Sequence, residues 1–358
     1  MKVSSPKTGG NYTSPRMPSA LRPQDPPPSR PTPEEFSVLA ERAMAQQPSP
    51  AGLPTRRLGK TNEQVSILCL GGAHLGRVGL KDEPEALRIF DAAVDNGVRF
   101  IDNAWAYNDG YSEVLVGKAM RPGVREKLFL MTKNTGRDYD RSKSCLDDSL
   151  RRLKTDYLDL WQFHETNYDN DPDWVFDRRG IDYALEAQQA GKVRYIGFTG
   201  HKDPRILNKM LGKGDAFDTA QMPINMMDYF YRSFFHETLP LCLAKDMGVL
   251  GMKTLGGGVG IAKIPDDTSI TAEQCLRYAL SQPIATAVRG WTKMEHLEAD
   301  LAVARDFKPM NSEELRSLLA IAETEAGDGR HEQFKSTRRF DNPIYREMHR
   351  LPVEGDQL

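Results

Sequence analysis

From residue 57 onward, short apolar stretches rich in β-branched residues alternate with longer stretches whose apolar residues recur every three or four positions. The first pattern is typical of buried parallel strands and the second of amphipathic helices. Eight such pairs follow one another at a period of roughly thirty residues, the length that a strand–helix unit needs. The predicted strands are 65–70, 99–102, 128–132, 157–163, 193–198, 219–222, 249–252 and 286–288, and the predicted helices are 85–96, 112–120, 141–152, 175–190, 204–211, 236–247, 272–281 and 294–305.

Eight strand–helix units in about 250 residues match the size of a closed (β/α)8 TIM barrel of the α/β class. The alternative is an open doubly wound sheet, which is expected to carry a G-x-G-x-x-G turn after its first strand. Gly71–Gly76 is a poor match to that turn, so we interpret its glycines as residues that permit a turn at a strand end. Residues 57–64 place turn formers between two apolar runs, which predicts an N-terminal hairpin closing the base of the barrel.

The segments before and after the predicted barrel differ from it in composition. Residues 1–54 hold 12 of the 23 prolines but only two aromatic residues, which predicts a proline-rich, largely disordered arm over 1–56. Within the arm, 33–46 could form a short helix that docks on the barrel or on a neighbour, or only a nascent helix in a disordered tail. After the barrel (57–310), we expect one extra helix over 312–326 and a polar tail, together forming a segment 311–358.

Composition narrows the classes of partner. The 358 residues are 39% hydrophobic, and 48 basic side chains against 50 acidic ones leave no basic excess to attract nucleic acid. Four cysteines lie far apart without a C-x-x-C clip, which favours a reducing, cytoplasmic location over a disulfide framework. No apolar run reaches the roughly 18–20 residues of a membrane helix, and no secretory signal is evident. We therefore expect no nucleic-acid partner and no membrane partner.

Chemistry in such a barrel is expected where the C-terminal ends of the strands converge. Reactive and polar residues occupy those positions in this chain: His74, Asp102, Tyr107, Lys133, His164, Thr199, His201, Gln221, Asn225 and Lys253.

Four of these residues form a chemically coherent set. Lys133 ends an apolar run, so its ammonium should point into the barrel mouth and need the counter-charge that Asp102 provides from the next strand. The lysine is expected to lower the pKa of the Tyr107 phenol, and His164 to form a hydrogen bond at a substrate oxygen. Each residue alone also has a structural interpretation, as an architectural ion pair, a surface aromatic or a satisfied core histidine. Their occurrence on three successive strand ends favours function.

Four segments resemble the aldo/keto reductase family. They are 100–120 (FIDNAWAYNDGYSEVLVGKAM), 130–133 (LMTK), 156–164 (DYLDLWQFH) and 191–197 (GKVRYIG). The resemblance covers about 57–307 and implies an NAD(P)H-dependent oxidoreductase that reduces an aldehyde or ketone to an alcohol by hydride transfer. It further implies a catalytic tetrad of Asp102, Tyr107, Lys133 and His164, with Tyr107 as the proton donor.

The resemblance also implies a site for the nicotinamide. Thr199 stands where a serine usually holds the carboxamide, and Gly200 replaces the usual asparagine. Gln221 matches well and would bind the carboxamide. Met252 and Lys253 stand where many members carry an aromatic residue that stacks on the nicotinamide ring.

At the other end of the cofactor, the glycine-rich loop 255–258 permits close approach to the pyrophosphate. Lys293 could meet a 2′-phosphate or be a solvated charge at a helix start, so NADPH is favoured and NADH stays open. Asp300 can accept from the adenine amino group. The residues implied here are Leu255, Gly257, Gly290, Thr292, Lys293 and Asp300.

The expected substrate is a small carbonyl compound whose pocket His74 and Trp105 could line. Two alternatives remain: a non-enzymatic NADP(H)-binding redox sensor, prompted by the proline-rich arm, and a metal-dependent hydrolase, prompted by His74, Lys133, His164 and His201. The hydrolase would need an H-x-H pair that strand one lacks, so no metal is expected. A homo-oligomer is left open.

Overall fold

The computed structural model describes residues 30–50, 52–257 and 263–353. Eight parallel strands close into a barrel, as the sequence predicts. In chain order they are β4 (Leu68–Gly71), β5 (Phe100–Asp102), β6 (Phe129–Asn134), β7 (Leu158–Phe163), β8 (Val193–Thr199), β9 (Thr219–Pro223), β10 (Gly248–Met252) and β11 (Thr286–Arg289). The barrel closes because β11 pairs with β4 in parallel register.

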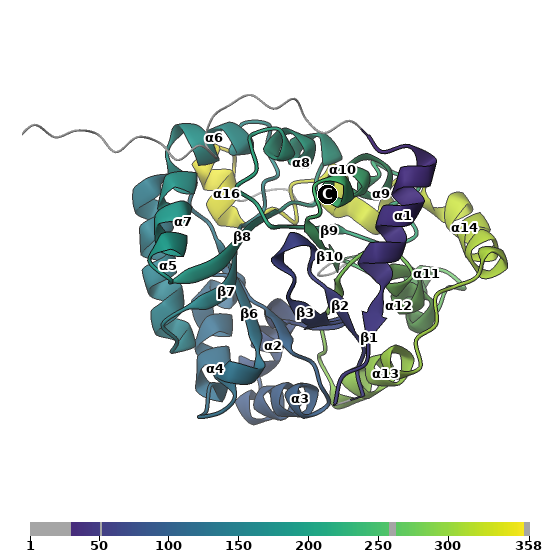
Figure 1. Cartoon of the computed structure of the whole chain (residues 1–358), viewed down its shortest axis with the longest axis horizontal. Helices are drawn as coiled ribbons and strands as arrows, with labels where there is room; N and C mark the ends of the chain where they lie inside the picture. The colour runs from purple at the N-terminus through teal and green to yellow at the C-terminus, as the bar shows by residue number, and fades with distance from the viewer. Residues whose placement is uncertain (1–29, 51, 258–262, 354–358) are drawn as a thin grey trace, which may run out of the picture.

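Helices surround the strands as a ring, seen in Figure 1. The main ones are α3 (Glu83–Asp95), α4 (Tyr111–Ala119), α5 (Tyr139–Leu153), α7 (Gly180–Gln189), α8 (Pro204–Leu211), α10 (Leu239–Ala244), α12 (Ala272–Leu280) and α13 (Met294–Arg305). Asp82, Asp138 and Asp203 begin three of them by accepting a hydrogen bond from a backbone N–H of the first turn. Within the described ranges, no helix has the length and apolarity to cross a membrane.

Two predicted helices are each divided into two. The predicted helix 175–190 becomes α6 (Asp171–Asp177) and α7, because Arg179 adopts a left-handed backbone with φ 66° before α7 begins. The predicted helix 236–247 becomes α9 (Phe234–Glu237) and α10, where Pro240 lies in the first turn of the second helix. Proline lacks the N–H that would continue α9, so the chain starts a new helix there.

The glycines after the first barrel strand do more than permit a turn, which corrects that prediction. They open α2 (Gly72–Gly79), an eight-residue helix that carries His74. A Cβ on Gly72 would lie 2.9 Å from both the Asp102 carbonyl oxygen and the Ser112 hydroxyl. Glycine is therefore required here because α2 packs directly on β5 and α4.

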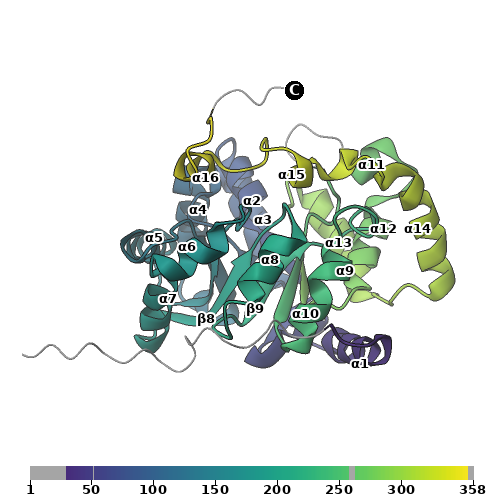
Figure 2. The same cartoon turned by 90° about the horizontal axis from the view of Figure 1, so that it is seen from above.

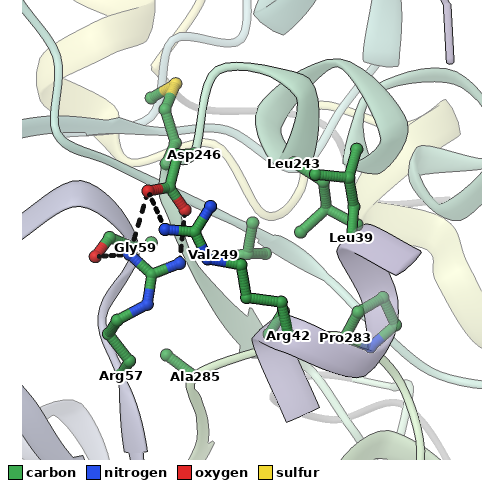
Figure 3. A pocket seen from close by; sticks show the side chains of 12 residues that line it. Leu39, Arg42, Arg57, Gly59, Leu243, Asp246, Val249, Pro283 and Ala285 are labelled. Atoms are coloured by element: carbon green, nitrogen blue, oxygen red, sulfur yellow. Dashed lines mark hydrogen bonds and ion pairs between the residues drawn. The ribbon is translucent and has the colours of Figure 1, made fainter. Parts of the chain in front are cut away.

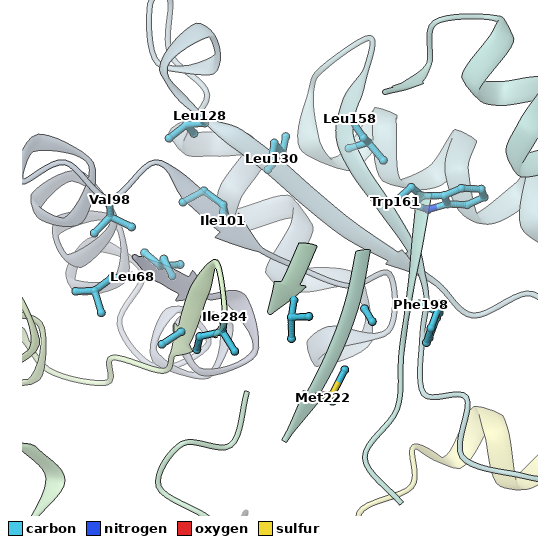
Figure 4. Close-up of a cluster of buried hydrophobic side chains, with 14 of the residues drawn as sticks. Leu68, Val98, Ile101, Leu128, Leu130, Leu158, Trp161, Phe198, Met222 and Ile284 are labelled. Carbon is cyan, nitrogen blue, oxygen red and sulfur yellow. The ribbon is translucent and has the colours of Figure 1, made fainter. Parts of the chain in front are cut away.

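The barrel interior and the helix layer receive alternate residues of each strand. Cys69, Phe100 and Met131 belong to an inner apolar cluster. Leu68 and Ile101, drawn in Figure 4, belong to the outer cluster that packs against the helices. The alternation follows from the period of two in a β-strand, so both faces of the sheet are buried.

The predicted hairpin closes the base of the barrel. Strands β2 (Thr55–Arg57) and β3 (Gln64–Ser66) pair antiparallel, and β1 (Gln46–Gln47) adds a third strand. Between β2 and β3, the fully buried Leu58 joins the inner apolar cluster, so the hairpin acts as a plug. In Figure 1, β2 and β3 lie across the centre of the view.

Part of the predicted arm packs on the barrel. Helix α1 (Pro33–Met44) begins with a capping box between Thr32 and Glu35 and contacts α10. Arg42 of α1 and Arg57 of β2 both bind the Asp246 carboxylate, at 3.2 Å and 2.5 Å, as Figure 3 shows. The helical alternative for 33–46 is thus confirmed for 33–44, and residues 1–29 lie outside the described residues.

The other end of the chain crosses the barrel mouth. After the predicted helix, found as α14 (Ser312–Ala326), the chain forms η5 (Arg330–Glu332), α15 (Gln333–Ser336) and α16 (Pro343–Met348). We call residues 330–353 the C-terminal strap. Figure 2 shows α15 and α16 on the opposite side of the barrel from α1. Phe334 and Tyr345 of the strap are fully buried, so the strap is ordered where a polar tail was expected.

A buried carboxylate in α4 ties the barrel wall together. Glu113 accepts hydrogen bonds from the hydroxyls of Thr132 (2.6 Å) and Ser149 (2.7 Å). Its second oxygen lies 3.2 Å from the Arg152 guanidinium. Because Thr132 belongs to β6 and the other two residues to α5, Glu113 links α4 to both elements.

We expect Glu113→Ala to lower the free energy of unfolding by about 3 kcal/mol, because it leaves buried hydroxyls and a guanidinium without their acceptor. Urea unfolding followed by circular dichroism measures the change. The matched control is Glu323→Ala at an exposed position of α14, where we expect less than about 0.5 kcal/mol. Equal losses in the two variants would contradict the assigned role.

Candidate active site

The barrel brings the four predicted tetrad residues together at the C-terminal ends of its strands. Lys133 of β6 is 1% exposed and its ammonium forms an ion pair with Asp102 at the end of β5. The same nitrogen donates to the Asn103 carbonyl oxygen at 2.8 Å and to the Tyr107 hydroxyl at 3.1 Å. All three protons of the ammonium therefore have acceptors, which is what a buried charge requires.

Tyr107 reaches the lysine from a tight turn. It begins the short 3-10 helix η3 (Tyr107–Gly110), where Asn108 and Asp109 both adopt a left-handed backbone with φ 54°. The Tyr107 ring lies 5.4 Å from the His164 ring, edge to face. The phenol is thus held between the ammonium and the imidazole.

The protonation state of Tyr107 differs from the sequence expectation. Burial and the nearby carboxylates of Asp102 and Glu165 raise the pKa of the phenol well above its ordinary value. The prediction that Lys133 lowers the pKa of Tyr107 is therefore wrong for the protein without a ligand. The half-buried phenolate would be poorly solvated, and the Asp102 carboxylate offsets the positive charge of the ammonium. Tyr107 is therefore held in its neutral, proton-bearing form.

His164 follows β7 and is held neutral. Burial, and then the positive charge of Lys133, lower the pKa of the imidazole well below its ordinary value. Its Nδ1 atom is buried and has no hydrogen-bond partner within the part of the chain that the structure describes. The other nitrogen, Nε2, makes no hydrogen bond to the described residues either, since its separation from Glu165 Oε1 is 3.9 Å, and it can bind a polar group of a ligand.

Gln221 of β9 offers the clearest fit to an amide ligand. Its Nε2 donates to the second carboxylate oxygen of Asp102 at 2.7 Å. Its Oε1 atom is buried and has no donor among the described residues. A buried acceptor of this kind is costly unless a ligand donates to it, and a carboxamide N–H suits it.

Thr199 pairs with Gln221 in the barrel, and Gly200 follows it. The Gly200 N–H donates to the Gln221 carbonyl oxygen at 3.2 Å. A Cβ on Gly200 would lie 2.7 Å from both Leu207 Cδ2 and the Thr166 carbonyl oxygen. This crowding explains why no asparagine stands at position 200.

Met252 and Lys253 end β10 at the mouth, both half-buried. The Lys253 ammonium lies 4.9 Å from the ring centroid of Phe334 in the strap. Burial lowers the pKa of Lys253, and Glu165 partly compensates. Lys253 is thus a cation at the mouth whose nearest aromatic neighbour comes from the C-terminal strap.

The glycine-rich loop is fastened to the strap. Gly256 and Gly257 adopt left-handed backbones with φ 58° and 61°, and the Gly257 N–H donates to the His331 carbonyl oxygen at 2.7 Å. The Leu255 carbonyl oxygen accepts from Ile264. Gly258 lies outside the described residues. The predicted pyrophosphate contact of this loop stays a prediction.

The predicted adenine end has partners that the sequence did not reveal. Asp300 accepts two hydrogen bonds from Arg289, at 2.7 Å and 3.0 Å, and one from the Trp291 indole at 2.7 Å. Thr292 and Lys293 are exposed just before α13. Asp300 therefore holds Arg289 and Trp291 in place, and its contact with adenine stays a prediction.

The two predicted substrate residues contact different parts of the protein. His74 of α2 is exposed and packs on Gly290, where a Cβ would meet its ring. Trp105 donates to Asp148 at 3.2 Å, and the guanidinium of Arg152 lies 5.0 Å from the centroid of its ring. Neither position tests their roles as pocket walls.

The structure adds Glu165, which sequence reasoning missed although it directly follows His164. Its Oε1 lies 3.9 Å from His164 Nε2, and its Oε2 accepts from the Asn342 N–H of the strap at 3.1 Å. The Arg137 guanidinium donates to the carbonyl oxygens of His164 (2.7 Å) and Glu165 (3.0 Å). An acidic residue at the end of a predicted strand was the available signal.

The described residues contain no candidate metal centre. In 30–50, 52–257 and 263–353, no group of three or more His, Cys, Asp or Glu side chains is placed to share a metal ion. The residues that prompted the hydrolase alternative are thus not assembled as ligands there.

Comparison with known proteins agrees with this geometry. Residues 67–269 match the aldo/keto reductase family. The chain is 32% identical over 227 residues to the uncharacterized oxidoreductase YrpG of Bacillus subtilis, covering 56% of this chain and 66% of that protein. It is 31% identical over 221 residues to a 6-dehydroglucose reductase of Novosphingobium aromaticivorans, covering 57% and 69%.

Among solved structures, the holo form of the aldo-keto reductase AKR11C1 from Bacillus halodurans superimposes with a TM-score of 0.64 at 26% identity. The superposition covers 78% of this chain and 99% of that chain. The barrel fold and the family match indicate an oxidoreductase on a (β/α)8 barrel. The chain belongs to the aldo/keto reductase family.

Glu165 generates a prediction for stability. Burial raises the pKa of its carboxyl to about 7, above the value of about 4.3 expected in the unfolded chain. The native state therefore favours the protonated form, and this contribution to stability is present at acidic pH and is lost as the pH rises through about 7. Wild type should lose about 3 kcal/mol of this contribution between pH 4.5 and pH 8, and Glu165→Gln should not. The free energy of unfolding of the variant relative to wild type should therefore rise by about 3 kcal/mol over that range.

Urea unfolding of both proteins at the two pH values measures this gain. The substitution keeps an acceptor for Asn342, so the strap contact is preserved. A difference between variant and wild type that does not change with pH would show that Glu165 titrates normally.

Proposed function

We propose that this protein reduces a small aldehyde or ketone to the alcohol with NAD(P)H, with Tyr107 as the proton donor. The observation that carries the proposal is the contact between the Tyr107 hydroxyl and Lys133 Nζ at 3.1 Å, beside the His164 ring. The family and the names of its relatives agree with an oxidoreductase acting on carbonyl compounds. The substrate itself is not specified by that agreement.

The cofactor would be held by groups already at the mouth. Gln221 Oε1 would accept from the carboxamide, and Thr199 would lie beside it. Lys253 would provide positive charge at the mouth. The exposed Lys293 would bind a 2′-phosphate, which favours NADPH over NADH. When bound, NADPH supplies the hydride and the side chains supply only orientation and the proton.

The proton step follows from the protonation states. Neutral Tyr107 holds a proton on its hydroxyl, and neutral His164 orients the carbonyl oxygen of the substrate. As negative charge develops on that oxygen, Tyr107 donates its proton and becomes a phenolate. Lys133 at 3.1 Å stabilises the phenolate, and Asp102 keeps the ammonium in position.

A cytoplasmic location is part of the proposal. Cys69, Cys145, Cys242 and Cys275 are all buried and unpaired with one another. Buried free thiols suit a reducing compartment.

Tyr107→Phe is expected to lower kcat for aldehyde reduction at least about 100-fold, because positioned acid catalysis is worth roughly 10²- to 10⁴-fold. Loss of NADPH absorbance with propanal and with an aromatic aldehyde measures the rate. The dissociation constant for NADPH, from quenching of protein fluorescence, should change by less than about threefold, since the ring is retained.

The matched control is Tyr139→Phe on the surface of α5, which should turn over normally. Residual activity above a few per cent in Tyr107→Phe would refute the assignment. Wild-type protein that binds NADPH but reduces no aldehyde or ketone would instead favour the redox sensor. Titration with NADH in parallel tests the cofactor preference.

A further inference from the structure

Glu165 is an ionisable group at the barrel mouth that the proposed proton step does not use. It directly follows His164, and its side chain is only 12% exposed. Its electrostatic neighbours include Tyr107, whose pKa it raises, and Lys253. The carboxylate therefore lies within reach of the place where the substrate carbonyl would bind.

The backbone at Glu165 adopts an unfavourable conformation that neighbouring side chains stabilise. Glu165 adopts a left-handed backbone with φ 48°, which is unfavourable for a residue with a side chain. Arg137 stabilises that conformation by donating to the carbonyl oxygens on both sides of the turn, and it is itself paired with Asp171 at 3.0 Å. A strained backbone that carries a largely buried carboxylate is a feature that proteins concentrate at functional sites.

The two oxygens of the carboxylate are not equivalent. The strap fixes Oε2 through the Asn342 N–H at 3.1 Å. Oε1 has no hydrogen-bond donor among the described residues, because its 3.9 Å separation from His164 Nε2 exceeds a hydrogen bond. One oxygen is thus oriented by the fold while the other is left to accept from a ligand.

The surroundings indicate the chemistry of that ligand. Carboxylates accept hydrogen bonds from hydroxyl or ammonium groups. The positive charges of Lys253 and Arg137 both act on Glu165, and that of Lys133 acts on the neighbouring His164. These positive charges oppose a cationic substrate and leave a neutral hydroxyl as the matching donor.

We propose that Glu165 determines substrate specificity by accepting, through Oε1, a hydrogen bond from a hydroxyl on the carbon next to the carbonyl of the substrate. This position follows because the Nε2 atom of His164 would contact the carbonyl oxygen, and Oε1 lies 3.9 Å from that nitrogen. The inference rests on the proposed function and assigns its substrates to α-hydroxy carbonyl compounds. A site that bonds a substrate hydroxyl discriminates against the analogue without it, since the carboxylate oxygen then has no donor from the substrate.

The test compares glyceraldehyde with propanal, using NADPH, in wild type and in Glu165→Gln. The quantity measured is kcat/KM for glyceraldehyde divided by kcat/KM for propanal. Part of each aldehyde is hydrated in water, but this affects both proteins equally and does not change the comparison between them. We expect the wild-type ratio to favour glyceraldehyde and to fall about tenfold in the variant, mainly through KM for glyceraldehyde. Glu165→Leu, which removes the acceptor entirely, should lower the ratio at least as far.

Glu298→Gln, at an exposed position of α13, serves as the matched control and should keep the wild-type ratio. A ratio unchanged in both Glu165 variants would overturn the specificity role while the reductase proposal stands. Absence of turnover with both aldehydes, and with the aromatic aldehyde, in wild type would overturn both proposals. A merely structural role would lower turnover of the two aldehydes equally, leave the ratio unchanged and so also overturn the inference.

Discussion

The buried ammonium of Lys133 at the mouth of the barrel determines how the other polar residues of the site are arranged. A buried charge must be paired, and Asp102 on the neighbouring strand pairs it. The remaining donors of the ammonium fix the Asn103 carbonyl and the Tyr107 hydroxyl. Asp102 in turn holds Gln221 from the opposite wall, so one ion pair arranges groups from three strands and a loop.

The same pair explains why Tyr107 is a neutral acid in the protein alone. A carboxylate beside the ammonium cancels most of its effect on the phenol, and burial then disfavours the phenolate. The proton consequently stays on Tyr107 in the protein alone, and in the proposed reaction it would be released only as charge develops on the substrate oxygen. A donor that releases its proton only when charge develops is suited to the reduction of a carbonyl group.

Much of the fold was predictable because its signals are local. Alternation of strand and helix patterns identified all eight barrel strands, and the strand ends identified Asp102, Lys133 and His164. The missed features depend on contacts between distant segments. Polar residues around Phe334 and Tyr345 conceal a strap that becomes ordered only by packing on the barrel. The partners of Asp300 are nearer in sequence, at Arg289 and Trp291, but no residue pattern indicates that α13 turns this carboxylate toward them.

Residues of the C-terminal strap line the mouth of the barrel together with residues from the strand ends. Phe334 lies against Lys253, the His331 carbonyl holds Gly257, and Asn342 holds Glu165. A second buried ion pair, between Lys335 and Asp228 at 2.6 Å, fastens the strap to the segment after β9. A substitution in the strap should therefore change the positions of Lys253, Gly257 or Glu165 through these three contacts.

The turnover of Lys133→Met tests the account most directly, because methionine keeps the length of the side chain and removes the charge. Assays at low temperature, after near-ultraviolet circular dichroism has shown native packing, allow for the destabilisation caused by leaving Asp102 without its cation. The account predicts that NADPH still binds and that kcat for propanal falls at least about 100-fold. A folded, cofactor-binding variant that reduces propanal at the wild-type rate would contradict it.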